Sequence, residues 1–226
     1  MRDISVKVIQ TEDGSTSLLR EDMNETYHSF RGALGESKKV FIECGLSSFH
    51  DEHPGLESIS VLEVGLGTGL NMWLTANYAT FHQQPITATS LEPFPIPQEV
   101  IGQLRFGQDL PGQTVLNEIH ACPWGSAVQI HAFFSLEKRQ EKFEDYKTSK
   151  KFDLIYFDAF APSKQPEVWS TDNLATCYGL LNKGGILTTY CAQGQFKRDL
   201  ASVGFDVQTL PGAMGKKEMV RGIRRT

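Results

Sequence analysis

The first part of the chain shows two patterns of apolar and polar positions. From Ile4 to Arg20 apolar and polar residues alternate on both sides of Asp13-Gly14, a dipeptide that accepts the positive φ angles of tight turns. This pattern predicts a β-hairpin. From Ser37 to Phe49 apolar residues recur at helical spacing, up to the breaker Pro54-Gly55. We therefore expect a hairpin and helix extension over residues 1–55 that packs on a main domain of residues 56–226.

From residue 59 onward, apolar runs typical of strands alternate with helical stretches. The predicted strands are Ile59–Val64, Ile86–Leu91, Val128–Phe134, Phe152–Phe157, Gly185–Cys191, Phe205–Leu210 and Glu218–Arg224. The predicted helices are Thr68–Tyr78, Thr171–Leu181, with a glycine cap in Asn182–Gly185, and Gln195–Val203. The charged stretch Glu137–Lys151 is interpreted as a solvated helix or loop. The alternation predicts an α/β fold with a mainly parallel, doubly wound sheet.

Composition adds limits on the class of protein. The 226 residues fit one globular domain, and 40% hydrophobic with 22% charged residues is ordinary for a folded protein. The N-terminus carries no apolar leader and no window suits a membrane span, so we expect a cytoplasmic protein without a membrane partner. The four cysteines are far apart and the histidines do not cluster, which predicts reduced thiols and no metal.

Charge leaves two interpretations of the C-terminal segment open. The net charge of −5 argues against a protein that coats nucleic acid through its overall field. Residues 214–226 nevertheless hold five basic residues and one acidic residue. This segment is either an ordinary basic tail or a surface that contacts phosphates.

A glycine-rich loop follows the first strand of the main domain. Strand residues 60–64 run into Gly65-Leu66-Gly67-Thr68-Gly69 and then into a helix, a context typical of nucleotide-binding loops. Leu70 stands where a dinucleotide motif needs its last glycine, which disfavours a nicotinamide cofactor. A carboxylate at Glu63 suits a cationic sulfonium better than a pyrophosphate, and Glu92 ends the next strand, where ribose hydroxyls bind. The alternative is a tight turn without a ligand. The candidate cofactor residues are Glu63, Gly65, Gly67, Thr68, Gly69, Asn71 and Glu92.

A second candidate loop begins at Asp158, directly after a predicted central strand. In an open α/β sheet this strand end faces the ligand crevice, where a carboxylate can act as a base. Two prolines and two aromatic residues stiffen the segment up to Trp169. A structural turn capped by Asp158 is the alternative. The strand end lacks the Asn/Asp-Pro-Pro-Tyr/Phe motif of aromatic amine methylation, and Cys122-Pro123 reverses the Pro-Cys order of pyrimidine-C5 chemistry.

Several motifs together resemble one known family. They are Asp13–Thr16, Asn24–Ser29, Val40–Glu43, Glu63–Asn71, the Asp-x-Phe-x-Pro-x-Lys-x-Pro-x-x-Trp pattern of Asp158–Trp169, and Gly212–Met219. They resemble the tRNA wobble-uridine methyltransferases of the MnmD type, which also form the methyltransferase half of bifunctional MnmC proteins. The resemblance implies a Rossmann-like, class I fold that uses S-adenosylmethionine. It also implies methylation of the aminomethyl nitrogen of 5-aminomethyl-2-thiouridine in the tRNA anticodon loop.

The resemblance assigns roles to further residues. Asp158 is then expected to orient the substrate ammonium, to accept its proton and to lie next to the cofactor. Phe160 and Tyr27 are expected to form walls of the site. Ser135 is expected to replace the family's acidic contact to the adenine amino group. Trp169 either stacks on the uracil ring or belongs to the core. Substrate contacts are expected from Glu25, Thr26, Pro162, Lys164, Lys216 and Lys217, with Arg221 and Arg224 as further phosphate contacts.

One consequence and four alternative functions remain to be stated. Because the sequence stops at Thr226, we expect a stand-alone methyltransferase without the FAD-dependent oxidase half. A small-molecule amine methyltransferase or an aminopropyl transferase uses similar loops. A cofactor-binding scaffold without turnover and a nicotinamide oxidoreductase are the remaining alternatives.

Overall fold

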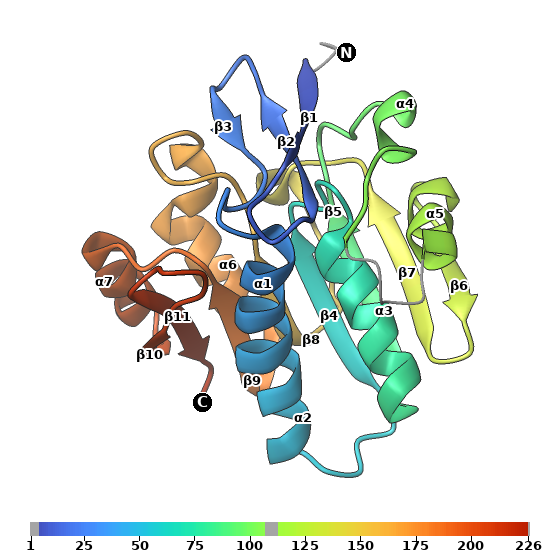
Figure 1. Ribbon diagram of the computed structural model, residues 1–226. Coiled ribbons are helices and arrows are strands. Elements are labelled where there is room, and N and C mark those ends of the chain that lie inside the picture. Colours follow the sequence, from blue (N-terminus) through green and yellow to red (C-terminus); the bar gives the residue numbers. More distant parts are fainter. Residues whose placement is uncertain (1–4, 107–112, 226) are drawn as a thin grey trace.

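The computed structural model describes residues 5–106 and 113–225. Its first element is the predicted hairpin, formed by strands β1 (Val6–Gln10) and β2 (Thr16–Arg20) in antiparallel register (Figure 1). Gly14 has a φ of +81° in the turn, and the Asp13 carboxylate accepts the backbone N–H of Ser15 at 3.1 Å. The hairpin prediction is therefore confirmed, although Ile4, where it was expected to begin, lies outside the described residues. A short strand β3 (Glu25–Thr26) extends this small sheet.

The main sheet has eight strands in the order β10-β11-β9-β8-β4-β5-β7-β6. Five of them run parallel, namely β4 (Ile59–Val64), β5 (Ile86–Leu91), β7 (Phe134–Arg139), β8 (Phe152–Phe157) and β9 (Leu181–Thr189). The strands β6 (Ala127–His131) and β11 (Glu218–Ile223) pair antiparallel with their neighbours, and β10 (Asp206–Pro211) pairs antiparallel with β11. The mainly parallel sheet is thus confirmed.

Helices cover both faces of this sheet (Figure 1). One layer holds α3 (Leu70–His82), α5 (Gln113–Ala121) and a continuous helical segment made of α1 (Ala33–Ser37), η1 (Lys38–Ser47) and α2 (Ser48–Glu52). The other layer holds α6 (Thr171–Leu180), α7 (Gly194–Ser202) and the 3-10 turn η3 (Pro166–Trp169). Two single turns, α4 (Gln98–Ile101) and η2 (Phe143–Asp145), complete the described elements. The doubly wound arrangement is confirmed.

The predicted helix at residues 37–49 exists, but its middle is widened. Over η1 the backbone forms π-type turns, which are rare in long runs. Thr188 on β9 donates its hydroxyl to the carbonyl of Val40 at 2.8 Å, and Arg221 on β11 donates to the carbonyl of Cys44 at 3.2 Å. Side chains that bond helix carbonyls disturb the regular ladder, and here they hold the helix against the sheet. Phe41 and Leu46 of this segment join the same core cluster as Ile59 and Val61 of β4.

Three predictions of local structure are wrong. The predicted strand Val128–Phe134 is a hairpin, in which β6 leads into β7, and the strand next to β5 begins only at Phe134. Residues Glu137–Arg139 therefore belong to a strand and not to a solvated helix or loop. The glycine cap of α6 is also absent, because Leu181 already has extended backbone angles and begins β9. Among the described residues, no helix combines the length and the apolar character that crossing a bilayer requires.

Candidate active site

The glycine loop links β4 to α3 through three residues with left-handed backbone angles. Gly65, Gly67 and Gly69 have φ values of +97°, +49° and +76°. A Cβ atom on Gly65 would lie 2.7 Å from the carbonyl oxygen of Asp158, and one on Gly67 would lie 2.9 Å from the ring of Tyr27. The missing side chains therefore allow two other parts of the protein to close onto the loop.

Asp158 follows β8 and lies beside the first turn of α3. Its backbone N–H donates to the carbonyl of Val64 at 3.0 Å, which holds the end of β8 against the end of β4. Its carboxylate oxygen Oδ2 accepts a hydrogen bond from Nδ2 of Asn71 at 2.7 Å. Burial raises the pKa of the Asp158 carboxyl well above its usual value, although the bond from Asn71 lowers it. The cofactor loop and the candidate base are thus joined directly.

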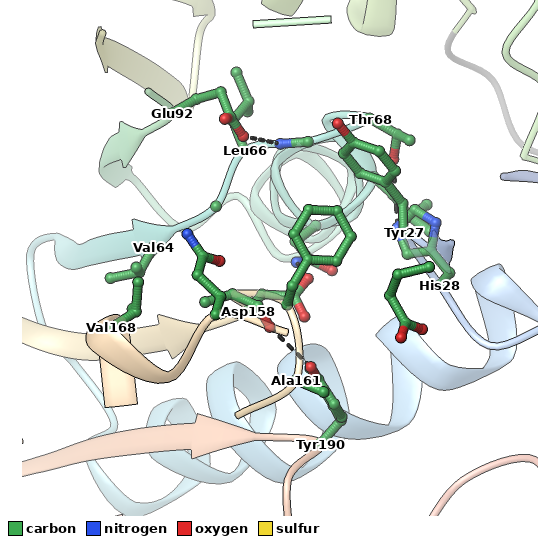
Figure 2. Close-up of a pocket in the computed structure, with 18 of the residues that line it drawn as sticks. Tyr27, His28, Val64, Leu66, Thr68, Glu92, Asp158, Ala161, Val168 and Tyr190 are labelled. Carbon is green, nitrogen blue, oxygen red and sulfur yellow. Dashed lines mark hydrogen bonds between the residues drawn. The ribbon is translucent and has the colours of Figure 1, made fainter. Parts of the chain in front are cut away.

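One pocket gathers most of the predicted site residues (Figure 2). Its lining includes eleven of them, which are Glu25, Thr26, Tyr27, Gly65, Gly67, Thr68, Asn71, Glu92, Asp158, Phe160 and Lys216. Pro162 and Lys217 lie instead on a second hollow, which shares Lys216, Tyr190 and Ala161 with the pocket. Figure 2 shows Tyr27, Glu92, Asp158 and Tyr190 arranged around the same space.

Glu92 fixes the backbone on two sides of the pocket. Oε2 accepts the N–H of Gly67 at 3.0 Å and Oε1 accepts the N–H of Phe94 at 2.9 Å. Burial raises the pKa of this carboxyl. A carboxylate offers about four lone-pair positions, so each oxygen keeps one for a further donor. Glu92 is therefore able to hold the loop and bind hydroxyl groups at the same time.

Aromatic side chains form another part of the pocket wall. The rings of Tyr27 and Phe160 meet edge to face with centroids 5.0 Å apart. The hydroxyl of Tyr190 donates to the carbonyl of Ala159 at 2.8 Å, which fixes the backbone next to Asp158. Trp169 is 6% exposed, packs in the core cluster and donates its indole N–H to the carbonyl of Phe160 at 2.7 Å. Of the two roles considered for Trp169, the structure supports the core role.

The structure does not bring Glu63 or Ser135 to the pocket wall. Glu63 is 0% exposed and lies beneath the loop, where Ser90 donates to its carboxyl group. Ser135 is the second residue of β7 and pairs with Thr87 of β5, so it lies at the end of the strand remote from the ligand crevice. The expected cofactor contact of Ser135 depended on the wrong strand boundary. Gly69 is also absent from the pocket lining, since its missing side chain faces His120.

Glu141 is an acidic pocket residue that the sequence prediction missed. It follows the true end of β7, lines the pocket and receives a hydrogen bond from Nε of Arg139 at 2.6 Å. Lys142 and Phe143 line the pocket next to it. When the strand is placed at residues 134–139, Glu141 is the first carboxylate after its carboxyl end. In a parallel sheet this end faces the ligand crevice, so the correct strand boundary would have identified Glu141.

Most of the residues predicted to contact phosphates already form bonds with other groups of the protein. Lys216 forms an ion pair with Glu36, and its ammonium lies 4.7 Å from the centroid of the Tyr190 ring. Lys164 donates to the carbonyl of Met23 at 2.9 Å. The guanidinium groups of Arg221 and Arg224 bond carbonyls of the helical segment and of the α6–β9 connection, at 3.2 Å and 2.6 Å respectively. Lys217 is exposed beside the second hollow.

Two histidines hold the loop residue Thr68. Nε2 of His28 lies 3.3 Å from the Thr68 hydroxyl, and Nε2 of His120 lies 3.0 Å from the Thr68 carbonyl. Nδ1 of His28 is 3.1 Å from the hydroxyl of Ser17 on β2. Burial lowers the pKa of both histidines to about 4. Both rings are therefore neutral near pH 7 and connect the hairpin and α5 to the loop.

Comparison with known proteins supports the fold and the resemblance. Residues 132–225 match a family described as S-adenosyl-L-methionine-dependent methyltransferase. The chain is 28% identical over 225 residues to the tRNA 5-methylaminomethyl-2-thiouridine biosynthesis bifunctional protein MnmC of Cupriavidus metallidurans, covering 93% of this chain and 33% of that protein. It is also 28% identical to the MnmC protein of Aromatoleum aromaticum, covering 95% of this chain and 35% of that protein. The chain thus spans about a third of the length of the curated relatives it matches.

Solved structures agree with the fold assignment. The crystal structure of MNMC2 from Aquifex aeolicus superposes with a TM-score of 0.77 at 21% identity, covering 98% of this chain and 71% of that one. Spermidine synthase from Thermotoga maritima superposes with a TM-score of 0.62 at 13% identity, covering 99% of this chain and 70% of that one. The predicted class I fold of S-adenosylmethionine-dependent methyltransferases is confirmed, and so is the resemblance to MnmC proteins.

The contact between Gly65 and Asp158 gives the first testable prediction. Gly65→Ala adds a methyl group against a backbone carbonyl and also strains a positive φ, so we expect a loss of about 2–5 kcal/mol in the free energy of unfolding. Gly14→Ala is the matched control, because Gly14 also has a positive φ but no atom within 4 Å of the added carbon. Urea unfolding measures both variants, and equal losses would contradict the proposed close packing.

The buried histidines give a second prediction, for stability against pH. Their pKa values in the folded protein, about 4, lie below the ordinary value of 6.5, so the unfolded chain binds protons that the folded chain excludes. The contribution of the two neutral rings to the free energy of unfolding is complete above about pH 6.5. It is lost as the pH falls toward 4, by up to about 3 kcal/mol for His28.

Thermal unfolding at a series of pH values tests this prediction. His28→Gln should flatten the fall in melting temperature between pH 6.5 and 4 compared with the original chain. His82→Gln is the control because the His82 ring is exposed, and it should leave that fall unchanged. A fall that is equally steep in all three proteins would argue against a buried neutral His28.

Proposed function

We propose that this chain transfers a methyl group from S-adenosylmethionine to the aminomethyl nitrogen of 5-aminomethyl-2-thiouridine at the tRNA wobble position. The observation that carries the proposal is that Asp158 and the glycine loop share one pocket, linked by the Asn71 hydrogen bond. The similarity along nearly the whole chain to proteins of 5-methylaminomethyl-2-thiouridine biosynthesis supports this substrate over other amines.

The pocket residues fit S-adenosylmethionine. Glu92 keeps acceptor positions for ribose hydroxyls, and apolar side chains for the adenine ring come from Leu66, Leu91 and Phe143. Glu141 takes the role first expected of Ser135, since its carboxylate suits the adenine amino group. The described lining holds five acidic and three basic side chains, a balance that favours a cationic ligand. When bound, S-adenosylmethionine supplies an electrophilic methyl group.

Asp158 supplies the proton chemistry that the substrate requires. A free alkylamine has a pKa of about 10, so it reaches the site as an ammonium, which has no lone pair for attack. The half-buried carboxylate of Asp158 binds this ammonium and accepts one of its protons, directly or through water. Tyr27 and Phe160 wall the site and limit the positions that the amine can take.

Substrate contacts away from the Asp158 carboxylate are assigned to the rim of the pocket. Glu25 and Thr26 of β3 line the pocket beside Tyr27, and Lys164 lies 3.9 Å from Glu25. The second hollow, bordered by Pro162, Lys216 and Lys217, continues the pocket and suits the neighbouring nucleotides of the anticodon loop. Exposed Lys217 is the strongest remaining candidate for a phosphate contact.

The direct test uses labelled S-adenosylmethionine and tRNA from a strain that lacks this activity. Digestion to nucleosides should place the label in 5-methylaminomethyl-2-thiouridine. Asp158→Asn keeps the size of the side chain but removes the base, so turnover should fall by about 100-fold or more. Binding of S-adenosylhomocysteine, measured by calorimetry, should change little.

The control is Asp51→Asn, which changes an exposed carboxylate on α2 and should keep full activity. Label on a small-molecule amine but not on tRNA would support the alternative of a small-molecule methyltransferase. Unchanged turnover of Asp158→Asn on tRNA would remove Asp158 from the mechanism.

A further inference from the structure

Two buried oxygen atoms beneath the glycine loop lack a hydrogen-bond donor among the described residues. They are Oε1 of Glu63 and Oδ1 of Asn71, and the side chains that carry them are 0% and 3% exposed. The two side chains are close neighbours, and the interaction of Asn71 with Glu63 lowers the pKa of Glu63. An ionised carboxylate and an amide oxygen are both acceptors, so no bond forms between them unless the carboxyl group carries a proton.

The remaining atoms of both side chains already have partners that fix their orientation. Oε2 of Glu63 accepts the hydroxyl of Ser90 from β5. Nδ2 of Asn71 donates to Oδ2 of Asp158 at 2.7 Å. The Asn71 nitrogen thus faces Asp158, and the Asn71 oxygen is left without a donor among the described residues.

An ionised Glu63 would be costly at this position. The group is fully buried and makes no ion pair with a described residue. Burial raises the pKa of Glu63 well above its usual value, and the nearby carboxylates of Asp158 and Glu92 raise it further, while hydrogen bonds from Ser90 and Asn71 lower it in part. A neutral acid removes this cost and supplies the missing donor for Asn71.

We propose that Glu63 is a neutral carboxylic acid whose hydroxyl donates to Oδ1 of Asn71, and that this bond keeps the Asn71 amide turned toward Asp158. Glu63 is then a positioning residue, because it acts on Asp158 only through Asn71. Its effect on methyl transfer rests on the proposed function, whereas its protonation does not. The proton stays on Glu63 throughout, while the substrate proton goes to Asp158.

The rival arrangement turns the Asn71 amide over. Its nitrogen would then donate to an ionised Glu63, and its oxygen would accept a proton from a neutral Asp158. The groups that surround the two carboxyls and influence this choice are Ser90, Glu92 and Tyr156 near Glu63, and Glu36, Lys216 and Tyr190 near Asp158. The two arrangements differ in which carboxyl carries the proton.

Infrared difference spectroscopy of the folded chain at neutral pH separates the arrangements without any turnover. We expect the carbonyl band of a protonated, buried carboxylic acid in the original protein, and we expect Glu63→Gln to remove it. A band that persists in Glu63→Gln and disappears in Asp158→Asn would establish the rival arrangement. Absence of the band from the original protein would also overturn the proposal. None of these results depends on tRNA methylation.

Turnover of three variants tests the positioning role. The amide of Glu63→Gln donates to Asn71 and accepts from Ser90, so turnover should stay within about twofold of the original. Glu63→Leu has a similar size but no donor, and should lower turnover by about tenfold, the order expected when one buried hydrogen bond is lost. Thr75→Val, which removes a buried hydroxyl one turn along α3, is the control and should keep turnover within about twofold.

The pH profile of the same variants separates positioning from a merely structural effect. When the Asn71 nitrogen no longer points steadily at Asp158, the carboxylate loses a donor and the pKa of Asp158 rises. The acid limb of turnover should therefore move to higher pH in Glu63→Leu and stay in place in Glu63→Gln. Equal losses in both variants, with normal melting temperatures and normal S-adenosylhomocysteine binding, would show that Glu63 acts as a charge.

Discussion

The hydrogen bond from Asn71 to Asp158 is the interaction on which the site depends. Asn71 belongs to the first turn of α3, directly after the glycine loop, and Asp158 directly follows β8. Because Gly65 has no side chain, the backbone that follows β4 can approach the backbone that follows β8. The cofactor loop and the candidate base therefore keep one fixed relation, which is the preorganisation that methyl transfer between two bound partners requires.

The N-terminal extension completes the site that the sheet begins. Tyr27 covers Gly67, and His28 reaches Thr68 from the small sheet. Glu36 on α1 forms an ion pair with Lys216, which precedes the last strand. Core residues of the helical segment also share one cluster with β4 and α3. The boundary predicted at residue 55 remains a prediction, but residues on both sides of it line one pocket.

The sequence allowed the central strands and the main site residues to be predicted. β4, β5 and β8 have the predicted bounds, because these strands are largely buried and each begins and ends on an apolar residue. The edge hairpin was misplaced, since its strands mix exposed and buried positions and periodicity alone does not separate them. That error hid Glu141 and gave Ser135 a role at the wrong end of β7. The ion pair between Lys216 and Glu36 was not predictable either, because the two residues are 180 positions apart in the sequence.

In the proposed mechanism the Asp158 carboxylate faces the reacting end of the cofactor. A crystal structure of the chain with S-adenosylhomocysteine tests it most directly. We expect the ligand in the pocket between the glycine loop and Glu92, with its sulfur on the side of Asp158 and its ribose hydroxyls at Glu92. A ligand bound elsewhere, or an Asp158 side chain turned away from the sulfur, would show that Asp158 is not the base for methyl transfer.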